Sequence, residues 1–526
     1  MKLLLNDGRL DINKTTKNGA TPFYIACECG QTKIVKLLLN DKRVDINKAT
    51  SDGWTPLYIA CQNGHIKIVK LLLNDKSEIN KGNNNGETAF YIACYNRQIE
   101  IVKLLLNDER VEVNKKNNND QTPFYIACEN GYIEIVMLLL NNKRVDINKP
   151  NDGITPLWIA YEKGHIEVVK ILLNKKRVDI NHPNKYSQKT LCWVVCENGH
   201  IEIMELLLND ERVNINKEEN DEATPFWIAC QNGQIEIVKL LLSNEGVDIN
   251  KPNSIGSTPL FVVCDYGHIE IVKILLSNKR ADVNKANNNN QTPLYIACRE
   301  EHIEIVELLL NDNRVDINKA ENESQTPLYL ACQEGYIEIV KLLLNDERIE
   351  VNKANNGETT PLYFACQEGH IDIVKLLLND NRVDINIAQN SGETPLWIVC
   401  EKGYIEIVKL LLNDKRIDIN KVNKTAVTPF YIACEKGHIE IVKLLISDQR
   451  VDINKSKNDG WTPFYIACFK GHIEIVKLLL NEKRISIRKK NNEEKSIIDI
   501  EKEKNHSEIV RLIQEFDTGK FPLTNH

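Results

Sequence analysis

The sequence predicts an all-α solenoid, which is a linear stack of short helix pairs. Three observations support this prediction: one phrase recurs about every 34 residues, each copy carries signals that start and stop a helix, and its apolar residues are spaced as on a helix face. Self-similarity at a period of roughly 20 to 50 residues is typical of repeat architectures. We number the repeats one to fourteen by their opening residues, which are Thr21, Thr55, Thr88, Thr122, Thr155, Thr190, Thr224, Thr258, Thr292, Thr326, Thr360, Thr394, Thr428 and Thr462.

The first helix of each repeat is predicted from its opening dipeptide and its apolar stripe. In repeat two, the hydroxyl of Thr55 can cap a helix, and Pro56 suits the first helical position because no backbone donor is needed there. Leu57 and Cys61 lie one turn apart on one apolar face. Gly64 is placed to take the left-handed conformation that ends a helix.

A second helix is predicted to begin near His65. Val69 and Leu72 belong to its buried stripe, whereas Lys70 points outward. A turn-rich segment follows, with an Asn- and Gly-rich tip that we call the finger. Because helices shorter than about 12 residues are marginal alone in water, each repeat must bury its apolar faces against the repeats before and after it.

These residues resemble the ankyrin repeat. The family pattern Thr-Pro-Leu-His-x-Ala-Ala, followed by Gly-His and an Ile-Val-x-x-Leu-Leu helix, appears here as Thr-Pro-Leu-Tyr-Ile-Ala-Cys at residues 292–298 and continues to Val-Asp-Ile-Asn at residues 315–318. The resemblance covers nearly the whole chain. It implies antiparallel helix pairs with a projecting finger between repeats, and a concave face of fingers and first helices that binds proteins.

The chain departs from the family pattern at three positions. The fourth residue is aromatic in all fourteen repeats, and the seventh is Cys in thirteen repeats and Tyr161 in the fifth. The segment after the second helix is one residue longer than the family norm and lacks its Gly. We expect an Asn such as Asn345 to end that helix in the left-handed conformation, which Asn tolerates better than other non-Gly residues.

Some repeats depart further. Repeat six opens with Thr190-Leu191 and has no Pro, while Arg97 and Glu301 stand where a Gly should end the first helix. A non-Gly residue in the left-handed conformation costs about 1–2 kcal/mol. Ordinary repeat decay accounts for these changes, and a local bend that shapes the binding face is the alternative.

The repeats define the expected domain organisation. Residues 1–20 lack a first helix, so they are either the start of a fragment or an imperfect cap formed by residues 2–6. At the other end, residues 497–502 replace an apolar helix by charged residues, as a terminal capping repeat requires. The expected parts are a partial repeat at 1–20, fourteen repeats at 21–495, a degenerate capping repeat at 496–516 and a tail at 517–526.

Composition limits the partners. With 67 basic and 74 acidic residues among 526, the net charge is −7, which gives no electrostatic support for non-specific binding to nucleic acid or anionic membranes. No apolar run approaches the 18 or so residues of a membrane span, and residues 3–5 are too short for a signal peptide. We therefore expect no nucleic-acid partner, no membrane insertion, a monomer, and an intracellular, cytoplasmic protein, with the nucleus open as an alternative.

The recurring Cys and His are expected to be structural. Adjacent helices pack about 8–10 Å apart, whereas a disulfide spans at most about 7 Å between Cα atoms. The chain has fifteen Cys and no Cys-x-x-Cys pair, so free buried thiols in a reducing compartment are predicted. Eight of the fourteen repeats carry one His at the start of the second helix, and the others carry Gln or Tyr, so these His are too sparse for metal ligation. No phosphate loop or nucleophile motif is present, so we expect no catalytic residues, metal or cofactor.

Two further columns allow competing interpretations. The aromatic fourth position, with residues such as Tyr24 and Trp158, is expected to be core, although a stacking platform for bases is the alternative. The finger Asn is expected to hydrogen-bond the finger, although the family presents this position to asparaginyl hydroxylases. The residues concerned are Asn148, Asn250, Asn318, Asn352, Asn420 and Asn454.

One variable column supplies the candidate binding residues. The last residue before the helix-ending Gly is mostly neutral in the early repeats, then acidic for three repeats and basic for three, which suggests a partner of defined polarity; copying of neighbours by tandem duplication is the alternative. Trp54 and Trp461 at two finger tips are candidate anchors for a partner, unless they pack on the next finger. The charged candidates are Glu300, Glu334, Glu368, Lys402, Lys436 and Lys470.

The predicted function is a non-catalytic scaffold or adaptor that binds a protein partner on its concave face. A regulatory or targeting subunit of an enzyme complex is one alternative, which co-purification of a catalytic subunit would favour. An array detached from a larger multidomain protein is the other, which sequence upstream of Met1 would reveal.

Overall fold

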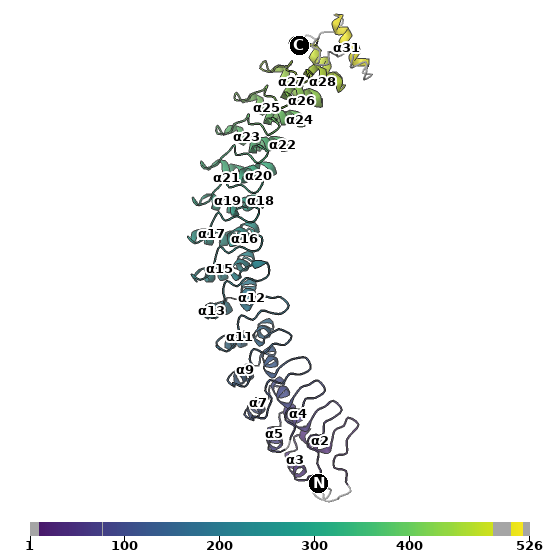
Figure 1. The fold of residues 1–526 in the computed structure, drawn as a ribbon, viewed down its shortest axis with the longest axis vertical. Helices are drawn as coiled ribbons and strands as arrows, with labels where there is room; N and C mark the ends of the chain where they lie inside the picture. The colour runs from purple at the N-terminus through teal and green to yellow at the C-terminus, as the bar shows by residue number, and fades with distance from the viewer. Residues whose placement is uncertain (1–9, 76, 488–506, 519–526) are drawn as a thin grey trace. The chain divides into compact units, whose positions relative to one another are not determined.

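The computed structural model describes residues 10–75, 77–487 and 507–518 (Figure 1). It divides into two compact halves, an N-terminal half of residues 1–254 and a C-terminal half of residues 255–526. The described residues form 29 α-helices, one short 3-10 turn and no strand. The all-α prediction is therefore confirmed for the part of the chain that the structure describes.

In both halves the helices come in pairs, one pair to each repeat. The N-terminal half contains α2 (Pro22–Glu28), α3 (Thr32–Leu39), α4 (Pro56–Gln62), α5 (Ile66–Leu73), α6 (Ala89–Tyr95), α7 (Ile99–Leu106), α8 (Pro123–Glu129), α9 (Ile133–Leu140), α10 (Pro156–Glu162), α11 (Ile166–Leu173), α12 (Leu191–Asn198), α13 (Ile201–Leu208), η1 (Asn220–Glu222), α14 (Pro225–Gln231) and α15 (Ile235–Leu242). The C-terminal half contains α16 (Pro259–Tyr266), α17 (Ile269–Ser277), α18 (Pro293–Arg299), α19 (Ile303–Leu310), α20 (Pro327–Glu334), α21 (Ile337–Leu344), α22 (Pro361–Glu368), α23 (Ile371–Asn379), α24 (Pro395–Lys402), α25 (Ile405–Asn413), α26 (Pro429–Lys436), α27 (Ile439–Ser447), α28 (Pro463–Phe469), α29 (Ile473–Leu480) and α31 (Ser507–Asp517).

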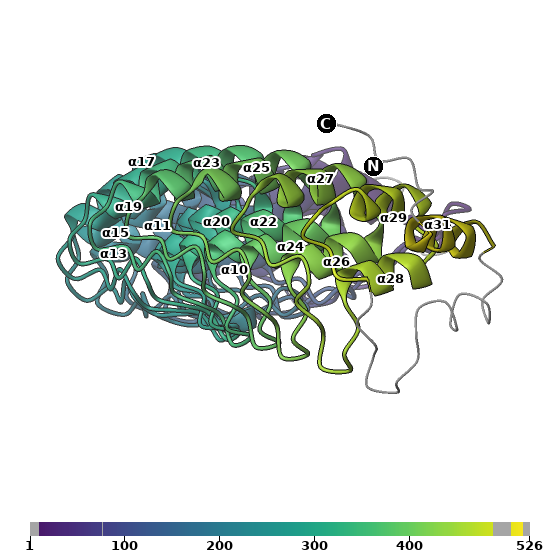
Figure 2. The same ribbon diagram turned by 90° about the horizontal axis from the view of Figure 1, so that it is seen from above.

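Each half is layered. First helices pack on first helices, as α20, α22, α24 and α26 do in turn, and second helices such as α21, α23, α25 and α27 form a parallel row. Figure 2 shows the second helices of the C-terminal half as the upper layer, the first helices below them, and the fingers projecting from the far side. The fingers and first helices therefore share one face, and the second helices form the other.

The predicted signals for the first helix operate as expected. The Thr hydroxyl accepts a hydrogen bond from the backbone N–H three residues on in thirteen of the fourteen repeats; Thr190 is the exception. The Gly after the helix has a positive φ, for example +80° at Gly64. Arg97 and Glu301 take the same conformation, with φ of 56° and 57°, so the strain expected there is present.

The prediction for the end of the second helix was wrong. Asn345 has φ −70° and ψ −16°, which is right-handed helical geometry. An arginine of the next repeat takes over the capping role: Nη2 of Arg382 donates to the carbonyl oxygen of Leu344, the last residue of α21, at 2.6 Å and is held by Asp380 at 2.7 Å. The last carbonyls of a helix need such a donor because no later N–H of the same helix reaches them.

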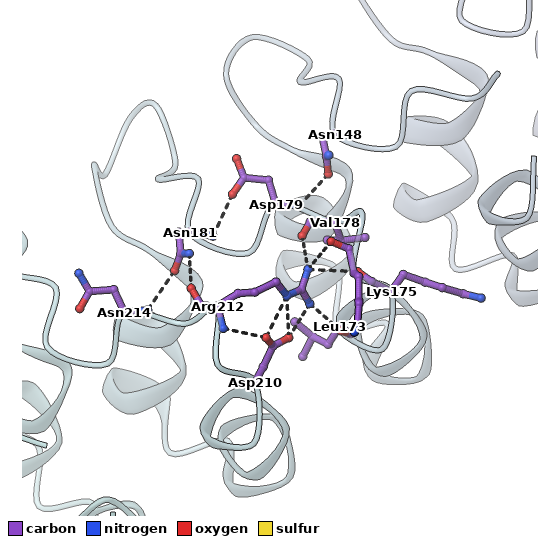
Figure 3. A network of polar contacts seen from close by, with 10 residues as sticks. Asn148, Leu173, Lys175, Val178, Asp179, Asn181, Asp210, Arg212 and Asn214 are labelled. Carbon is purple, nitrogen blue, oxygen red and sulfur yellow. Dashed lines mark hydrogen bonds and ion pairs between the residues drawn. The ribbon is translucent and has the colours of Figure 1, made fainter. Parts of the chain in front are cut away.

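We call this arrangement the arginine clamp, and it recurs along both halves. In Figure 3, Nη1 of Arg212 donates to the carbonyl oxygen of Val178 at 2.7 Å, its Nη2 donates to that of Leu173 at 3.2 Å, and Asp210 holds the guanidinium. Every clamp joins one repeat to the one before it. Clamps to the end of the preceding second helix are made by Arg110, Arg144, Arg212, Arg314, Arg348, Arg382, Arg416, Arg450 and Arg484.

The clamps predict sensitivity to acid. A hydrogen bond from the clamp arginine lowers the pKa of its aspartate, as the bond from Arg382 does for Asp380. A carboxyl whose pKa is lower in the folded than in the unfolded chain contributes its stability above the unfolded pKa, near 4, and loses it as the pH falls through the folded pKa. The aspartates concerned are Asp41, Asp108, Asp210, Asp312, Asp346, Asp380, Asp414 and Asp448.

We therefore expect urea unfolding midpoints to drop steeply below about pH 4. Replacing these eight aspartates by Asn supplies the control, because Asn142 already stands at this position and its Oδ1 accepts the backbone N–H of Arg144 at 2.9 Å. Asn keeps the turn but does not titrate, so the variant should show a flatter midpoint between pH 5 and pH 2. An equally steep curve in both proteins would contradict the role assigned to the clamps.

The core consists of the recurring apolar columns. Cys298 and its equivalents are buried, and all fifteen Cys are free; Cys29 is exposed, and it lies outside the thirteen-residue column. The aromatic fourth position is buried too, including Tyr24 and Trp158, which confirms it as core and leaves no stacking platform. At the C-terminal end, α31 packs on α29 through Ile509 and Leu512.

Several predictions on the ends of the chain lie outside the described residues. These are the cap at residues 2–6 and the altered first helix at residues 497–502. The domain boundaries stay predictions.

Candidate protein-binding surface

The six charged candidates form one row in the C-terminal half. Each stands at the end of a first helix, from Glu300 after α18 to Lys470 after α28, and these helices contact one another in sequence order. All six side chains are exposed, whereas the preceding turn of each helix is buried. We call them the end-of-helix row. The fold therefore brings the predicted residues together along the row of packed first helices.

Two of the three acidic members of the row have a neutral hydrogen-bond partner, and the third has a cationic one. Glu334 accepts a hydrogen bond from Gln333 at 3.1 Å, and Glu368 accepts one from Gln367 at the same distance. Glu300 is paired with Arg299 at 2.8 Å. Glu334 and Glu368 thus keep their full charge on the surface.

The basic members are partly compensated. Nζ of Lys436 lies 3.1 Å from a carboxylate oxygen of Glu401, and that of Lys470 lies 3.7 Å from one of Glu435, each glutamate belonging to the preceding repeat. The residue at the equivalent position before Lys402 is the neutral Gln367. Exposed pairs contribute at most about 1 kcal/mol, so they weaken the basic charge without removing it.

Trp54 and Trp461 differ from the exposed anchors that were expected. Both are half-buried. The ring of Trp54 stacks on that of Tyr58 in the repeat that follows, with ring centroids 6.1 Å apart, and the centroids of Trp461 and Tyr465 are 4.6 Å apart. Each indole therefore packs on an aromatic ring of the first helix that follows it, and covers that ring.

Sequence reasoning missed two exposed apolar residues near the start of repeat eight. Tyr266 of this repeat is 55% exposed, and Ile255, at the finger tip just before it, is 59% exposed. Tyr266 stacks on His268 at 6.2 Å and stands in the same column as Glu300, one repeat earlier. The sequence could have singled out Tyr266, because it is the single aromatic residue of that column.

The histidines at the start of the second helices hold neighbouring repeats together. Nε2 of His302 lies 3.1 Å from the carbonyl oxygen of Asp265 in the preceding repeat, to which it donates. In other repeats Gln98 donates to the carbonyl of Gln62 at 3.2 Å in the same way. This shared geometry explains why Gln replaces His, and it confirms the structural role.

The finger asparagines form a second connection between repeats. Nδ2 of Asn352 donates to the carbonyl oxygen of Arg382 at 2.8 Å, and its Oδ1 accepts from the backbone N–H of Asp384 at 2.8 Å. Asn181 bridges to the next finger in Figure 3 by the same two atoms. The expected hydrogen-bonding role is confirmed, with the bonds directed to the next finger.

The described residues hold little reactive chemistry. They contain no group of three or more His, Cys, Asp or Glu side chains placed to bind a metal ion. Burial raises the pKa of the Cys298 thiol far above its ordinary value, which keeps it protonated and a poor nucleophile. No helix in the described ranges is both long enough and apolar enough to cross a membrane.

Comparisons with known proteins agree with this architecture. A family model described as ankyrin repeats (3 copies) matches overlapping segments at residues 1–83, 42–117, 90–184, 176–253, 245–321, 313–389, 348–423, 381–457, 416–491 and 449–521. A crystal structure titled as EF0377, an ankyrin repeat protein, aligns with 32% identity and a TM-score of 0.34 over 36% of this chain and 96% of that one. A comparison with curated proteins gave no match.

Ankyrin repeats are generally protein–protein interaction modules, and their fold is typically non-enzymatic. With matches to the family model along nearly its whole length, the chain belongs to the ankyrin-repeat family.

Proposed function

We propose that this protein is a non-catalytic scaffold or adaptor that binds a protein partner along the face shared by its fingers and first helices. The observation that carries the proposal is the end-of-helix row. Six charged side chains are exposed at one repeated position, while the helical turn before each is buried. Variation confined to an exposed position on a constant framework is what a binding surface needs, because it can change partner without disturbing the core.

The row also gives the partner a direction. We propose an extended or helical segment whose basic stretch faces Glu300, Glu334 and Glu368 and whose acidic stretch faces Lys402, Lys436 and Lys470. The ion pairs of Lys436 and Lys470 with the preceding repeats weaken the second contact. The acidic half should therefore contribute more to selectivity, and Tyr266 supplies an exposed aromatic contact next to it.

Reversing the sign of all six row residues is expected to weaken partner binding at least tenfold and to reduce its salt dependence. The physical reason is that aligned charges steer association and fix register, although each pair alone contributes less than about 1 kcal/mol. The measurement is affinity purification from the native cell followed by mass spectrometry, and then titration of the retained partner at two salt concentrations. Circular dichroism verifies that the variant is folded.

A matched control changes equally many charges on the opposite face. The pairs Glu338–Lys341, Asp372–Lys375 and Glu406–Lys409 lie on second helices and are exposed, and swapping the two residues within each pair keeps the pairing. The control should retain the partner that the row variant loses. If the row variant retains the same partner with unchanged affinity and salt dependence, the charge pattern is better explained by tandem duplication.

A further inference from the structure

Departures from the repeat pattern are concentrated in repeats six and seven. At the start of α12, Thr190 makes no capping hydrogen bond, and its Oγ1 is buried without a partner in the described chain. In the same helix, Nε1 of Trp193 is also buried and unpaired, as is that of Trp397 in repeat twelve, whereas Nε1 of Trp158 donates to the carbonyl of His182 at 3.1 Å. A buried polar atom that loses its bond to water and gains no other is destabilising.

The finger between these two repeats is strained. Asp221 and Glu222 both have positive φ, 62° and 59°, and they follow each other directly. At the position of Glu222 some fingers carry Gly, for example Gly86 and Gly256, which adopt this conformation without a Cβ penalty, and others carry a non-Gly residue with positive φ, such as Asp120, so the added strain of this finger is at Asp221. No other two consecutive non-Gly residues of the described ranges share a positive φ.

Repeat seven also lacks its arginine clamp. The sequence has Arg at the clamp position of every finger except two, which carry Ser77 and Gly246. By register, an arginine at 246 would reach the carbonyl oxygen of Leu208 at the end of α13.

Repeat two offers a comparison, because Ser77 also replaces the clamp arginine. The Ser77 hydroxyl donates to the carbonyl oxygen of Leu72 in α5 of its own repeat at 2.7 Å, so it does not replace the clamp on α3 of the preceding repeat. Its first helix is capped by Thr55 as usual. A single departure in repeat two contrasts with the four in repeats six and seven.

From this clustering we infer that repeats six and seven, residues 190–246, are a built-in opening point of the array. The stability of a repeat protein is close to a sum of the stabilities of its repeats and of the interfaces between neighbours. A stretch that has lost a cap, an indole hydrogen bond, an unstrained finger and a clamp therefore opens at lower cost than its neighbours. The chain unfolds as two blocks, one on each side of this stretch.

Hydrogen exchange of the full chain, followed by mass spectrometry, tests the inference. Peptides of α12 to α15 are expected to exchange at least about tenfold faster than the corresponding peptides of α6 to α9 and of α20 to α23. Urea unfolding should show two transitions. Equal exchange rates in the three stretches would overturn the inference.

The variant Gly246→Arg restores the clamp. Its backbone is already in the required geometry, because the N–H of Gly246 donates to Oδ1 of Asn244 at 2.8 Å, as the N–H of Arg144 does to Asn142 at 2.9 Å. Arg144 reaches the carbonyl oxygen of Leu106 from that turn at 2.6 Å. A charged hydrogen bond of this kind is expected to slow exchange in α13 to α15 about tenfold.

Two further variants keep the test decisive. Glu222→Gly relieves the finger strain without new contacts, and it should also slow exchange in this stretch. Arg348→Gly removes a clamp in the C-terminal half and should speed exchange in α19 to α21 while leaving α12 to α15 unchanged. Unchanged exchange in both Gly246→Arg and Glu222→Gly, with Arg348→Gly behaving as expected, would also overturn the inference.

Discussion

Replacing Cys298 by Asp is expected to destabilise the protein by about 3–5 kcal/mol, the scale of an uncompensated buried charge. Cys298 has no exposed surface, and its side chain is packed among apolar residues of α18 and the neighbouring helices. The new carboxyl would either stay charged without a partner or take up a proton at a cost. Urea unfolding monitored by circular dichroism measures the loss.

Cys298→Ala is the matched control. The thiol is free and buried, and Ala stands at this position in the family pattern, so the expected loss is no more than about 1 kcal/mol. The same contrast should appear at other members of the column, such as Cys332 and Cys366. If Cys→Ala at several repeats instead abolished folding, or released a bound metal ion, the structural role of the column would be wrong.

Replacing Gly437 by Ala is expected to cost about 2–4 kcal/mol. Gly437 has a φ of +82°, which costs an L-residue about 1–2 kcal/mol. A Cβ there would also lie 2.6 Å from Cε1 of His472 in the next repeat, so the ring would have to move. Moving it disrupts the 2.9 Å hydrogen bond from His472 to the carbonyl of Glu435, which adds about 1 kcal/mol.

The chain supplies its own control for this prediction. Gly164 has a similar φ of +75°, but nothing lies within 4 Å of the place its Cβ would occupy. Gly164→Ala should therefore show the backbone cost alone. Adding His472→Ala to Gly437→Ala should recover the part due to the clash. Hydrogen exchange measures the local stability of α10 and α26 in the two variants. Equal losses of stability at both sites would show that the neighbouring repeat does not contribute to the cost at Gly437.

The local features of each repeat could be predicted from sequence because they depend on residues a few positions apart. Thr55 and Pro56 start a helix, and Gly64 ends it, through backbone geometry and hydrogen bonds within one turn. The burial of Cys298 follows from its spacing on an apolar stripe. Fourteen copies of the same signals determined the fold class with no tertiary information.

Features that depend on contacts between repeats could not be predicted from the sequence. The end of the second helix was assigned to Asn345, whereas Arg382 of the next repeat caps the helix that ends there. Similarly, Gly437 is followed directly by His438 in the sequence, yet the side chain that fills the space beside it is that of His472. Periodicity gives each residue a role in its own repeat but does not show which atoms of a neighbour it meets.

The candidate surface divides in the same way. The sequence by itself determined the sign and spacing of the charges at Glu334 and Lys436, because a fixed position in a repeated helix recurs at a fixed place on one face. Only the tertiary structure decided that Glu401 of the preceding repeat compensates Lys436 and that Trp461 covers Tyr465. The physical reason is that these contacts depend on how far long side chains reach across packed surfaces, and reach is set by three-dimensional packing.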